Sequence, residues 1–365
     1  MRNHGVVSIR AWHHESGTPL AEIRVRGRLR FGHASSMDLR EFTADDAASV
    51  RIATGIENVR NAVDAPWELP LSEHRMAMEV RHGWDGEPGR YFLAYDGDTA
   101  VGLGHIGASE WDNLDLAWLD LKVLPERRRS GHGTALLDGL LAEVRATERH
   151  LVGVDAWDGT PGPAFAEAHG FVHRSQEIKR RMHLAEVQLE QVRALRDHAA
   201  AAASSYELLR LPGRTPDDLL DGVVEMTRAI NDAPSDNLEV EDEEYSPERI
   251  RTYENAVIQG DRRLYRLVAR HRQSGELAGH TVVAVDVDAP EQSEQHDTSV
   301  VRAHRGHRLG LLLKAEMVLW LAEAEPQLET VDTWNAESNA HMIGVNERLG
   351  YRVLGREMQF QRRLS

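Results

Sequence analysis

Cysteine is absent from this chain of 365 residues, which excludes disulfides, thiolate metal sites and a cysteine-borne covalent intermediate. No apolar run approaches the ~20 residues that a membrane-spanning helix needs. Lysine is scarce, with only Lys122, Lys179 and Lys314 in the sequence. A formal net charge of −16 argues against a nucleic-acid partner, which requires a basic face. These absences favour a cytoplasmic protein with no nucleic-acid or membrane partner.

Residues 1–36 differ in composition from the rest of the chain. They are rich in arginine and histidine, lack a sustained apolar period, and lack the apolar core of a signal peptide. We predict a disordered extension there, with Met37 as a plausible true start. His13 and His14 have no regular scaffold around them, so no metal site is predicted.

An internal repeat organises the remaining residues. Asp120 matches Asp297 at an offset of 177 positions, and the segment 154–157 matches 331–334 at the same offset. Near the end, Gly170-Phe171 matches Gly350-Tyr351, where the offset has grown to 180. We therefore predict two copies of one domain, copy one at 37–183 and copy two at 206–365, joined by a helical linker at 184–205.

The pattern inside each copy predicts an α/β fold, a mixed central sheet flanked by helices. Each copy is expected to open with a short strand and two helices, at 44–56 and 72–83 in copy one and at 216–232 and 246–260 in copy two. The later elements of copy one are expected to be strands at 90–95, 99–108, 116–124 and 150–157, with a helix at 131–147. Those of copy two are strands at 263–270, 277–286, 297–302 and 328–334, with a helix from about 308.

A short basic turn joins a strand to a helix in copy one. Its glycines let the backbone approach a ligand closely, and the first helical turn leaves N–H groups without partners. Those N–H groups and the positive end of the helix dipole favour an anion such as a diphosphate. The predicted ligand-binding residues here are Val123, Leu124, Arg128, Arg129, Ser130, Gly131, His132, Gly133 and Thr134.

Copy two has a turn of equal length, in which Arg305 and Gly310 match Arg128 and Gly133. Arg308 stands where copy one has Gly131. The backbone N–H groups survive that change and the extra cation could contact a phosphate; alternatively, the bulk of Arg308 blocks the site. The predicted residues are Val300, Val301, Arg305, Gly306, His307, Arg308, Leu309 and Gly310.

The Arg-x-x-Gly-x-Gly spacing of Arg128, Gly131 and Gly133 resembles the signature of the GNAT (GCN5-related) N-acetyltransferase superfamily, and the tandem layout is similar to that of mycothiol synthase. The segment 334–339 and the later Leu349-Gly350-Tyr351 resemble the superfamily's usual finish. The resemblance implies acetyl-CoA or another acyl-CoA as co-substrate, no metal, and direct attack by an amine in a ternary complex. The expected acceptor is a primary amine of a small molecule, and the expected assembly is a monomer or a homodimer.

The resemblance also suggests catalytic residues. Family members often carry an acidic base on the strand that holds Asp120 in copy one and Asp297 in copy two. Asn339 fits a helix cap or a contact to the cofactor arm. The family's usual acid, a tyrosine, is replaced by Asn346 in copy two and by Ala166 in copy one, so water or another residue must protonate the leaving thiolate. The catalytic candidates are therefore Asp297, Asn339, Asn346 and Asp120.

Two questions stay open at this stage. The acidic segment 236–245 either concentrates a cationic amine by electrostatic steering or is an ordinary solvated loop. The missing tyrosines keep a non-catalytic acyl-CoA sensor or scaffold possible, and acylation of a protein amino group is a third alternative. Copy two is favoured for the chemistry, with copy one binding CoA at least structurally. The repeated Asp155 and Asp332 are expected to be structural.

Overall fold

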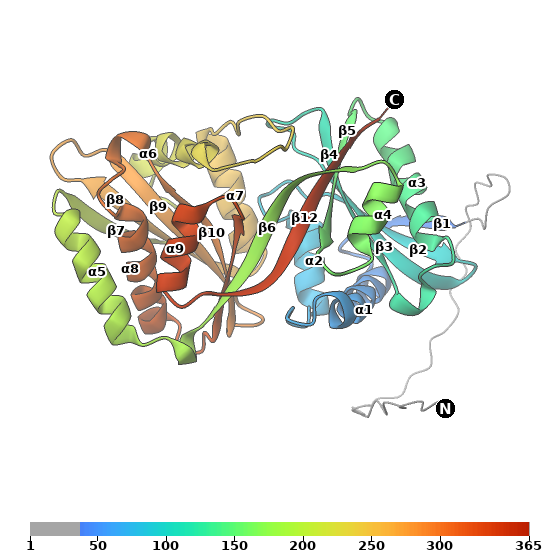
Figure 1. Ribbon diagram of the computed structural model, residues 1–365, viewed down its shortest axis with the longest axis horizontal. Helices are drawn as coiled ribbons and strands as arrows, with labels where there is room; N and C mark the ends of the chain where they lie inside the picture. Colours follow the sequence, from blue (N-terminus) through green and yellow to red (C-terminus); the bar gives the residue numbers. More distant parts are fainter. Residues whose placement is uncertain (1–36, 365) are drawn as a thin grey trace. The chain divides into compact units, whose positions relative to one another are not determined.

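The computed structural model describes residues 37–364, so the predicted extension with His13 and His14 lies outside the described residues. Twelve strands lie in that part of the chain: β1 (Asp38–Phe42), β2 (Arg90–Asp96), β3 (Thr99–Gly107), β4 (Leu116–Val123), β5 (Leu151–Trp157), β6 (Val172–His183), β7 (Tyr206–Pro212), β8 (Arg262–His271), β9 (Leu277–Asp286), β10 (Gln292–Val300), β11 (Thr330–Ala336) and β12 (Arg352–Arg363). They form one sheet in the order β1-β2-β3-β4-β5-β12-β6-β11-β10-β9-β8-β7 (Figure 1).

The α-helices of the described residues are α1 (Ala47–Asp64), α2 (Glu73–His82), α3 (His132–Arg145), α4 (Gly162–Ala168), α5 (Leu189–Ala202), α6 (Asp217–Thr227), α7 (Pro247–Gln259), α8 (Leu309–Ala324) and α9 (Ala340–Arg348). The order strand, two helices, three strands, helix, strand, helix, strand occurs twice along the chain. This mixed sheet with flanking helices confirms the predicted α/β fold class. No helix within residues 37–364 is long and apolar enough to cross a membrane.

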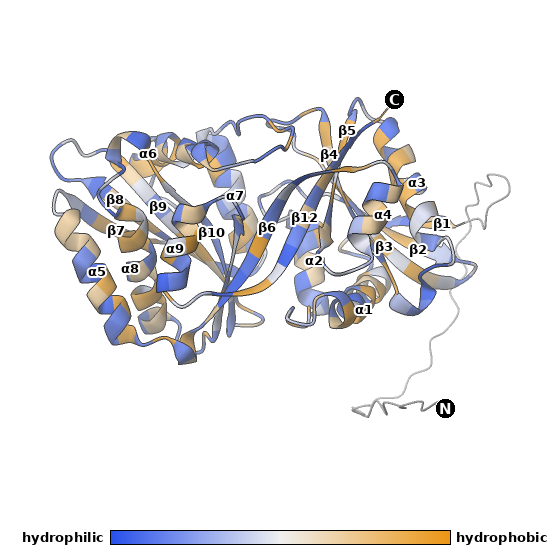
Figure 2. Ribbon diagram, in the orientation of Figure 1, coloured by the Kyte–Doolittle hydropathy of each residue, from blue (hydrophilic) through white to orange (hydrophobic). Residues whose placement is uncertain are grey.

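Successive side chains of a strand point to opposite faces of the sheet, and in each copy both faces carry buried apolar residues. In copy one, Leu93 and Leu103 pack with α1 and α2, whereas Phe92 and Leu119 pack with α3. In copy two, α6 and α7 cover one face, while α8 and α5 pack on the other. Because α8 lies between the sheet and α5, most of its residues are apolar, as its colouring in Figure 2 indicates.

The last strand of each copy pairs with strands of the other copy. β12 runs antiparallel between β5 and β6, and β6 also pairs antiparallel with β11. In Figure 1 these two long strands lie side by side in the middle of the sheet. The cores of the two copies are therefore joined by backbone hydrogen bonds. Only partners far apart in the sequence are involved, so local patterning could not predict this exchange.

Each copy contains one parallel strand pair that stays together over only half its length. The parallel pairing of β4 with β5 ends at Leu119 opposite Val154, and that of β10 with β11 ends at Gln295 opposite Thr333. Beyond these points the strands separate, so the segments 120–123 and 296–300 keep one edge that is not paired to the parallel neighbour. Each opening lies beside the turn that follows β4 or β10.

One predicted strand of copy two differs from the structure. β10 begins at Gln292, five positions before the predicted start at 297. Its early residues are polar, which hid them from a pattern of apolar alternation. The side-chain amide nitrogen of buried Gln295 donates to Thr281 Oγ1 and to Val282 O, both at 2.8 Å. These hydrogen bonds allow a polar residue to lie inside the sheet.

Candidate functional site

Both turns have the same backbone shape. Copy one has left-handed residues at Arg129 (φ 62°) and Gly131 (φ 86°), and copy two has them at Gly306 (φ 86°) and Arg308 (φ 58°). Arginine and glycine have exchanged places between the two copies, but the conformation is kept. Arg308 therefore does not distort the turn, because it adopts the conformation that Gly131 adopts in copy one.

The amides of these turns are free to bind an anion. Between residues 37 and 364, no group accepts a hydrogen bond from the backbone N–H groups of 129–134 or of 306–310. Neither α3 nor α8 has a side-chain cap at its N-terminus. A Cβ atom built on Gly131 or Gly310 would meet no atom within 4 Å. Open amides at a helix N-terminus fit the diphosphate of an acyl-CoA.

The two signature arginines hold the turns in place. Arg128 donates to Val123 O (3.2 Å) and to both carboxylate oxygens of Asp64 (2.8 and 2.6 Å). Arg305 likewise donates to Val300 O (3.0 Å) and to Asp232 (2.6 Å). Arg128 thus connects the end of β4 to the last residue of α1, and Arg305 connects the end of β10 to the segment after α6. Both guanidinium groups therefore already have protein partners.

Several other predicted turn residues also have protein partners. Buried His132 hydrogen-bonds Arg127 O (2.8 Å) and the Asp96 carboxylate (3.2 Å). The guanidinium of Arg308 reaches His198 on α5. The remaining contacts are between Thr134 Oγ1 and His169 Nε2 (3.1 Å) and between His307 Nδ1 and His304 O (3.2 Å). Arg129, Ser130 and Gly306 are exposed, and Leu309 and Gly310 are buried.

Two strand-end amides are not available as oxyanion donors. Leu124 N–H donates to Val101 O (3.0 Å), and Val301 N–H donates to Ala278 O (2.9 Å). Of the four strand-end residues predicted to bind the ligand, Val123 and Val300 therefore remain as candidate oxyanion donors, because they lie at the ends of the unpaired edges.

Asp120 is held by a cation. It forms an ion pair with Lys122, two residues along β4, and Lys122 also contacts Glu57 of α1 at 2.6 Å. Burial alone would raise the pKa of Asp120, but the charges of Lys122 and Arg60 outweigh it and hold the pKa below its usual value. A carboxylate with a lowered pKa is a weak base, so this environment does not favour proton abstraction by Asp120.

Asp297 has a different environment at the matching position of copy two. Ser299 replaces Lys122, and Asp297 makes no hydrogen bond or ion pair with any residue between 37 and 364. Burial raises the pKa of Asp297 above its ordinary value, although His296, Arg266 and Arg249 oppose the shift. An unpaired carboxylate with a raised pKa is suited to take a proton from an amine.

The two predicted asparagines have clear structural contacts. Asn339 is the N-cap of α9 and accepts from Met342 N–H at 3.2 Å. Asn346 is fully buried and donates to Asn335 Oδ1 at 2.6 Å, while its own Oδ1 has no partner within the described residues. The structural expectation for Asp332 agrees with its ion pairs to Arg181 (2.6 Å) and Lys179 (3.2 Å).

Asp155 has an environment that the sequence reasoning missed. Its side chain is exposed and accepts a hydrogen bond from Trp118 Nε1 at 2.5 Å. Although this side chain reaches solvent, the protein atoms around it displace much of its water, and this desolvation raises the pKa of Asp155 to about 7. The Trp118 hydrogen bond opposes the shift, and the nearby charges of Glu177 and Asp120 add to it. Its match to Asp332 in the repeat suggested a shared structural role, but only Asp332 has a cation beside it.

The acidic segment 236–245 bridges the two copies. Asp236 accepts from Ser175 (2.8 Å) and from Ser338 (2.5 Å), and these residues line a cavity of about 570 Å³ with Glu337 and Asn237. Glu239 pairs with Arg174 of copy one at 2.7 Å. Several of these carboxylates are therefore already bound to the protein, which weakens their role in steering a cation.

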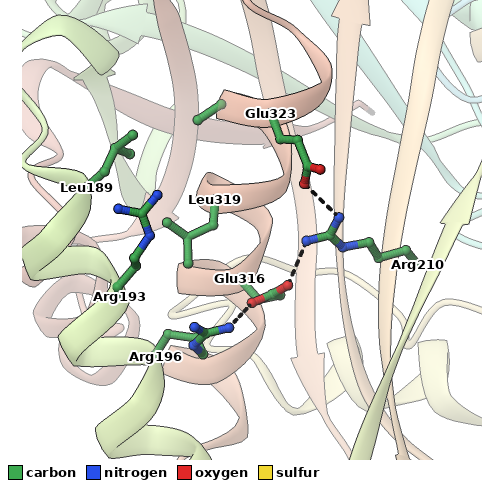
Figure 3. A pocket seen from close by; sticks show the side chains of 8 residues that line it. Leu189, Arg193, Arg196, Arg210, Glu316, Leu319 and Glu323 are labelled. Atoms are coloured by element: carbon green, nitrogen blue, oxygen red, sulfur yellow. Dashed lines mark hydrogen bonds and ion pairs between the residues drawn. The ribbon is translucent and has the colours of Figure 1, made fainter.

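A second groove lies between α5, α8 and β7, with a volume of about 330 Å³. Figure 3 shows Glu316 between Arg196 (2.9 Å) and Arg210 (2.8 Å), and Arg210 also reaches Glu323 (3.1 Å). The remaining arginine of the lining, Arg193, pairs with Glu190 at 2.5 Å. Each charged group that lines this groove therefore already has a partner of opposite charge.

Comparisons with known proteins indicate which family this chain is similar to. The Acetyltransferase (GNAT) family profile matches residues 56–171. A mycothiol acetyltransferase of Stackebrandtia nassauensis is 29% identical over 136 residues, which is 36% of this chain and 43% of that relative. The chain thus covers less than half the length of this curated relative.

Solved structures extend the likeness to both copies. A tandem GNAT protein from the clavulanic acid biosynthesis pathway, solved without acetyl-CoA, is 26% identical with a TM-score of 0.74, covering 90% of this chain and 98% of that one. A GCN5-related N-acetyltransferase from Sphaerobacter thermophilus shares the fold at 16% identity, with a TM-score of 0.62 and coverage of 90% and 95%.

Proposed function

Because this chain carries a GNAT-family acetyltransferase domain and is similar in fold to a tandem GNAT protein over nine-tenths of its length, we propose that it transfers the acetyl group of acetyl-CoA to a primary amine of a small molecule. The observation that carries the proposal is the pair of matching turns, each presenting free amides beside an opening in the sheet. Acetyl-CoA supplies the activated thioester, and the turns hold its diphosphate.

The acceptor would enter from the face covered by α6 and α7 in copy two. Asp297 lies there near Arg249 of α7 and takes the proton that the attacking amine loses. Val300, at the end of the unpaired edge of β10, provides the amide donor for the developing oxyanion. The net charge of −16 favours cationic acceptors over anionic ones.

The test is the stoichiometry of CoA binding in two variants, measured by isothermal titration calorimetry. Gly131→Glu and Gly310→Glu each place bulk and negative charge at one turn, and each should remove one of two binding sites. Gly131→Asn, which tolerates a left-handed backbone, and Gly310→Ala are the controls and should bind normally.

Two results would contradict the proposal. Unchanged binding in both glutamate variants would show that the turns do not hold CoA. Tight CoA binding with no release of CoA thiol from acetyl-CoA on any amine of a broad panel would identify a sensor or scaffold instead of an enzyme.

A further inference from the structure

Three buried polar residues lie on neighbouring elements of copy two, at positions where copy one is apolar. Lys314 of α8, Asn346 of α9 and Tyr351, just before β12, are 2%, 0% and 4% exposed. The corresponding positions of copy one hold only members of its apolar core: Leu137, Ala166 and Phe171. Replacing three packed apolar residues by polar ones is costly unless the polar groups have a use.

Contacts join these residues into one cluster. The Lys314 ammonium lies 5.0 Å from the centre of the Tyr351 ring. The backbone N–H of Tyr351 donates to the backbone carbonyl of Asn346 at 3.0 Å, as that of Phe171 does to Ala166 in copy one, so Tyr351 lies next to the end of α9. Asn346 in turn binds Asn335 of β11, beyond Thr333, where the pairing of β10 with β11 ends. The cluster therefore lies between α8 and α9, alongside the opening of copy two.

Lys314 has no countercharge. The other two lysines are ion-paired, Lys122 with Glu57 and Lys179 with Glu68, both at 2.6 Å. Lys314 makes no hydrogen bond or ion pair with any residue from 37 to 364, and burial lowers the pKa of Lys314 to about 7.

The titratable groups on the elements packed around α8 do not compensate this amine. Burial raises the pKa of Tyr351 far above its ordinary value, so the phenol stays neutral. Asp332 of β11 acts on Tyr351 but is paired with Arg181 and Lys179. The charged groups on the other neighbouring elements also have different partners or are exposed: Arg196 of α5 binds Glu316, Tyr265 of β8 binds Glu325, His280 of β9 binds Arg266, Glu294 of β10 binds Arg262, and His341, Glu347 and Arg348 of α9 are exposed.

We propose that Lys314 is the catalytic acid of copy two, donating a proton to the sulfur atom of CoA as the thioester carbon–sulfur bond breaks. The inference depends on the proposed acetyl transfer. An acyl-CoA bound at the turn before α8 enters the opening between β10 and β11. From there it passes between α8 and α9, where it meets Asn346, Tyr351 and Lys314. The Lys314 ammonium gives one proton to the thiolate and becomes a neutral amine. The acceptor nitrogen loses one proton on the opposite face, to Asp297, and exchange with water restores both groups.

Proton transfer in this direction is favourable, because an ordinary thiol has a pKa of about 8.5, above that of this buried ammonium. Copy one has Leu137 at the matching position and Asp120 bound to Lys122 at the position of Asp297. It therefore lacks both the acid and the free base, which assigns the chemistry to copy two and leaves copy one a binding role.

The first test places the amine relative to the sulfur without measuring turnover. The protein is labelled with 15N-lysine, and the Lys314 signal among three is identified by its loss in Lys314→Met. Its titration is followed by NMR with CoA and with desulfo-CoA, which lacks the sulfur atom. We expect the Lys314 titration midpoint to differ between the two complexes, because only CoA places a titratable sulfur atom beside the amine.

The outcomes separate this inference from the proposed function. Binding of both ligands with equal midpoints would overturn the role of Lys314 alone. Failure of either ligand to bind, measured by calorimetry, would overturn the proposed function and the role of Lys314 with it.

The second test uses acetyl-CoA with hydroxylamine, a small amine that is neutral near pH 7. Lys314→Met should lower kcat by ~10²-fold or more with little change in KM for acetyl-CoA. The wild-type rate should fall as pH rises above about 7, and the variant should lose this limb of the profile. Leu137→Met is the matched control in copy one and should change neither quantity. A pH profile of unchanged shape in Lys314→Met would contradict the proposal.

Discussion

At the scale of single residues, equivalent positions of the two copies carry different chemistry. Asp120 and Asp297 occupy the same place in the repeat, yet Lys122 lowers the pKa of Asp120 while burial raises that of Asp297. The repeat could be found in the sequence, because it is a matter of spacing. The pKa shifts of the two aspartates could not be predicted in the same way. They depend on the side chain two positions along the strand, on the same face, and on how deeply the fold encloses each carboxylate.

Asp155 gives a prediction about pH and stability. Its folded pKa of about 7 lies above its ordinary value, so the folded state holds the proton more tightly than the unfolded state. The stability that Asp155 contributes is fully present at low pH and is lost as pH rises toward about 7. Asp155→Asn keeps an acceptor for Trp118, so its Tm should exceed that of wild type at about pH 8 and by less at about pH 5. A Tm difference that does not depend on pH would show that Asp155 is not perturbed.

At the scale of elements, the sequence predicted the helices and turns that depend on the local spacing of apolar residues and glycines. The three- and four-residue spacing of Leu137, Leu140 and Leu141 predicts the helix that the structure has as α3, and the glycine-containing basic turn before it is where the structure has free amides. The cluster around Lys314 was not predicted, since Lys314 and Asn346 come together only through the packing of α8 against α9.

The turns give a prediction about backbone strain. A non-glycine residue in the left-handed conformation costs about 1 kcal/mol, and Arg308 adopts it at φ 58°. Arg308→Gly should raise the free energy of unfolding by about 1 kcal/mol, measured by urea denaturation, and should leave the backbone amides of the turn intact. Arg129→Gly, at φ 62° in copy one, is the matched variant and should give a similar gain. A loss of stability in both would mean that their side chains contribute more than the strain costs.

At the scale of the whole chain, the exchange of β6 and β12 makes the two copies depend on each other. Phe360 is close to the C-terminus but is fully buried in the core of copy one, with Leu119 and Val154. β12 also pairs with β6 along most of its length, and β6 carries the pairing on to β11 of copy two. Opening copy one at this strand therefore removes backbone partners from the sheet of copy two, so we expect the described part of the chain to unfold in one cooperative transition.

Phe360→Ala tests this dependence. Truncating a fully buried phenylalanine should lower the free energy of unfolding by about 3–5 kcal/mol. Hydrogen exchange followed by mass spectrometry should show faster exchange in β2–β4 of copy one and in β8–β10 of copy two, although the removed side chain touches only the first core. Val353→Ala, at a position of β12 that is 44% exposed, is the control and should change little. Faster exchange confined to copy one, or two separate thermal transitions in the variant, would show that the copies fold independently despite their shared strands.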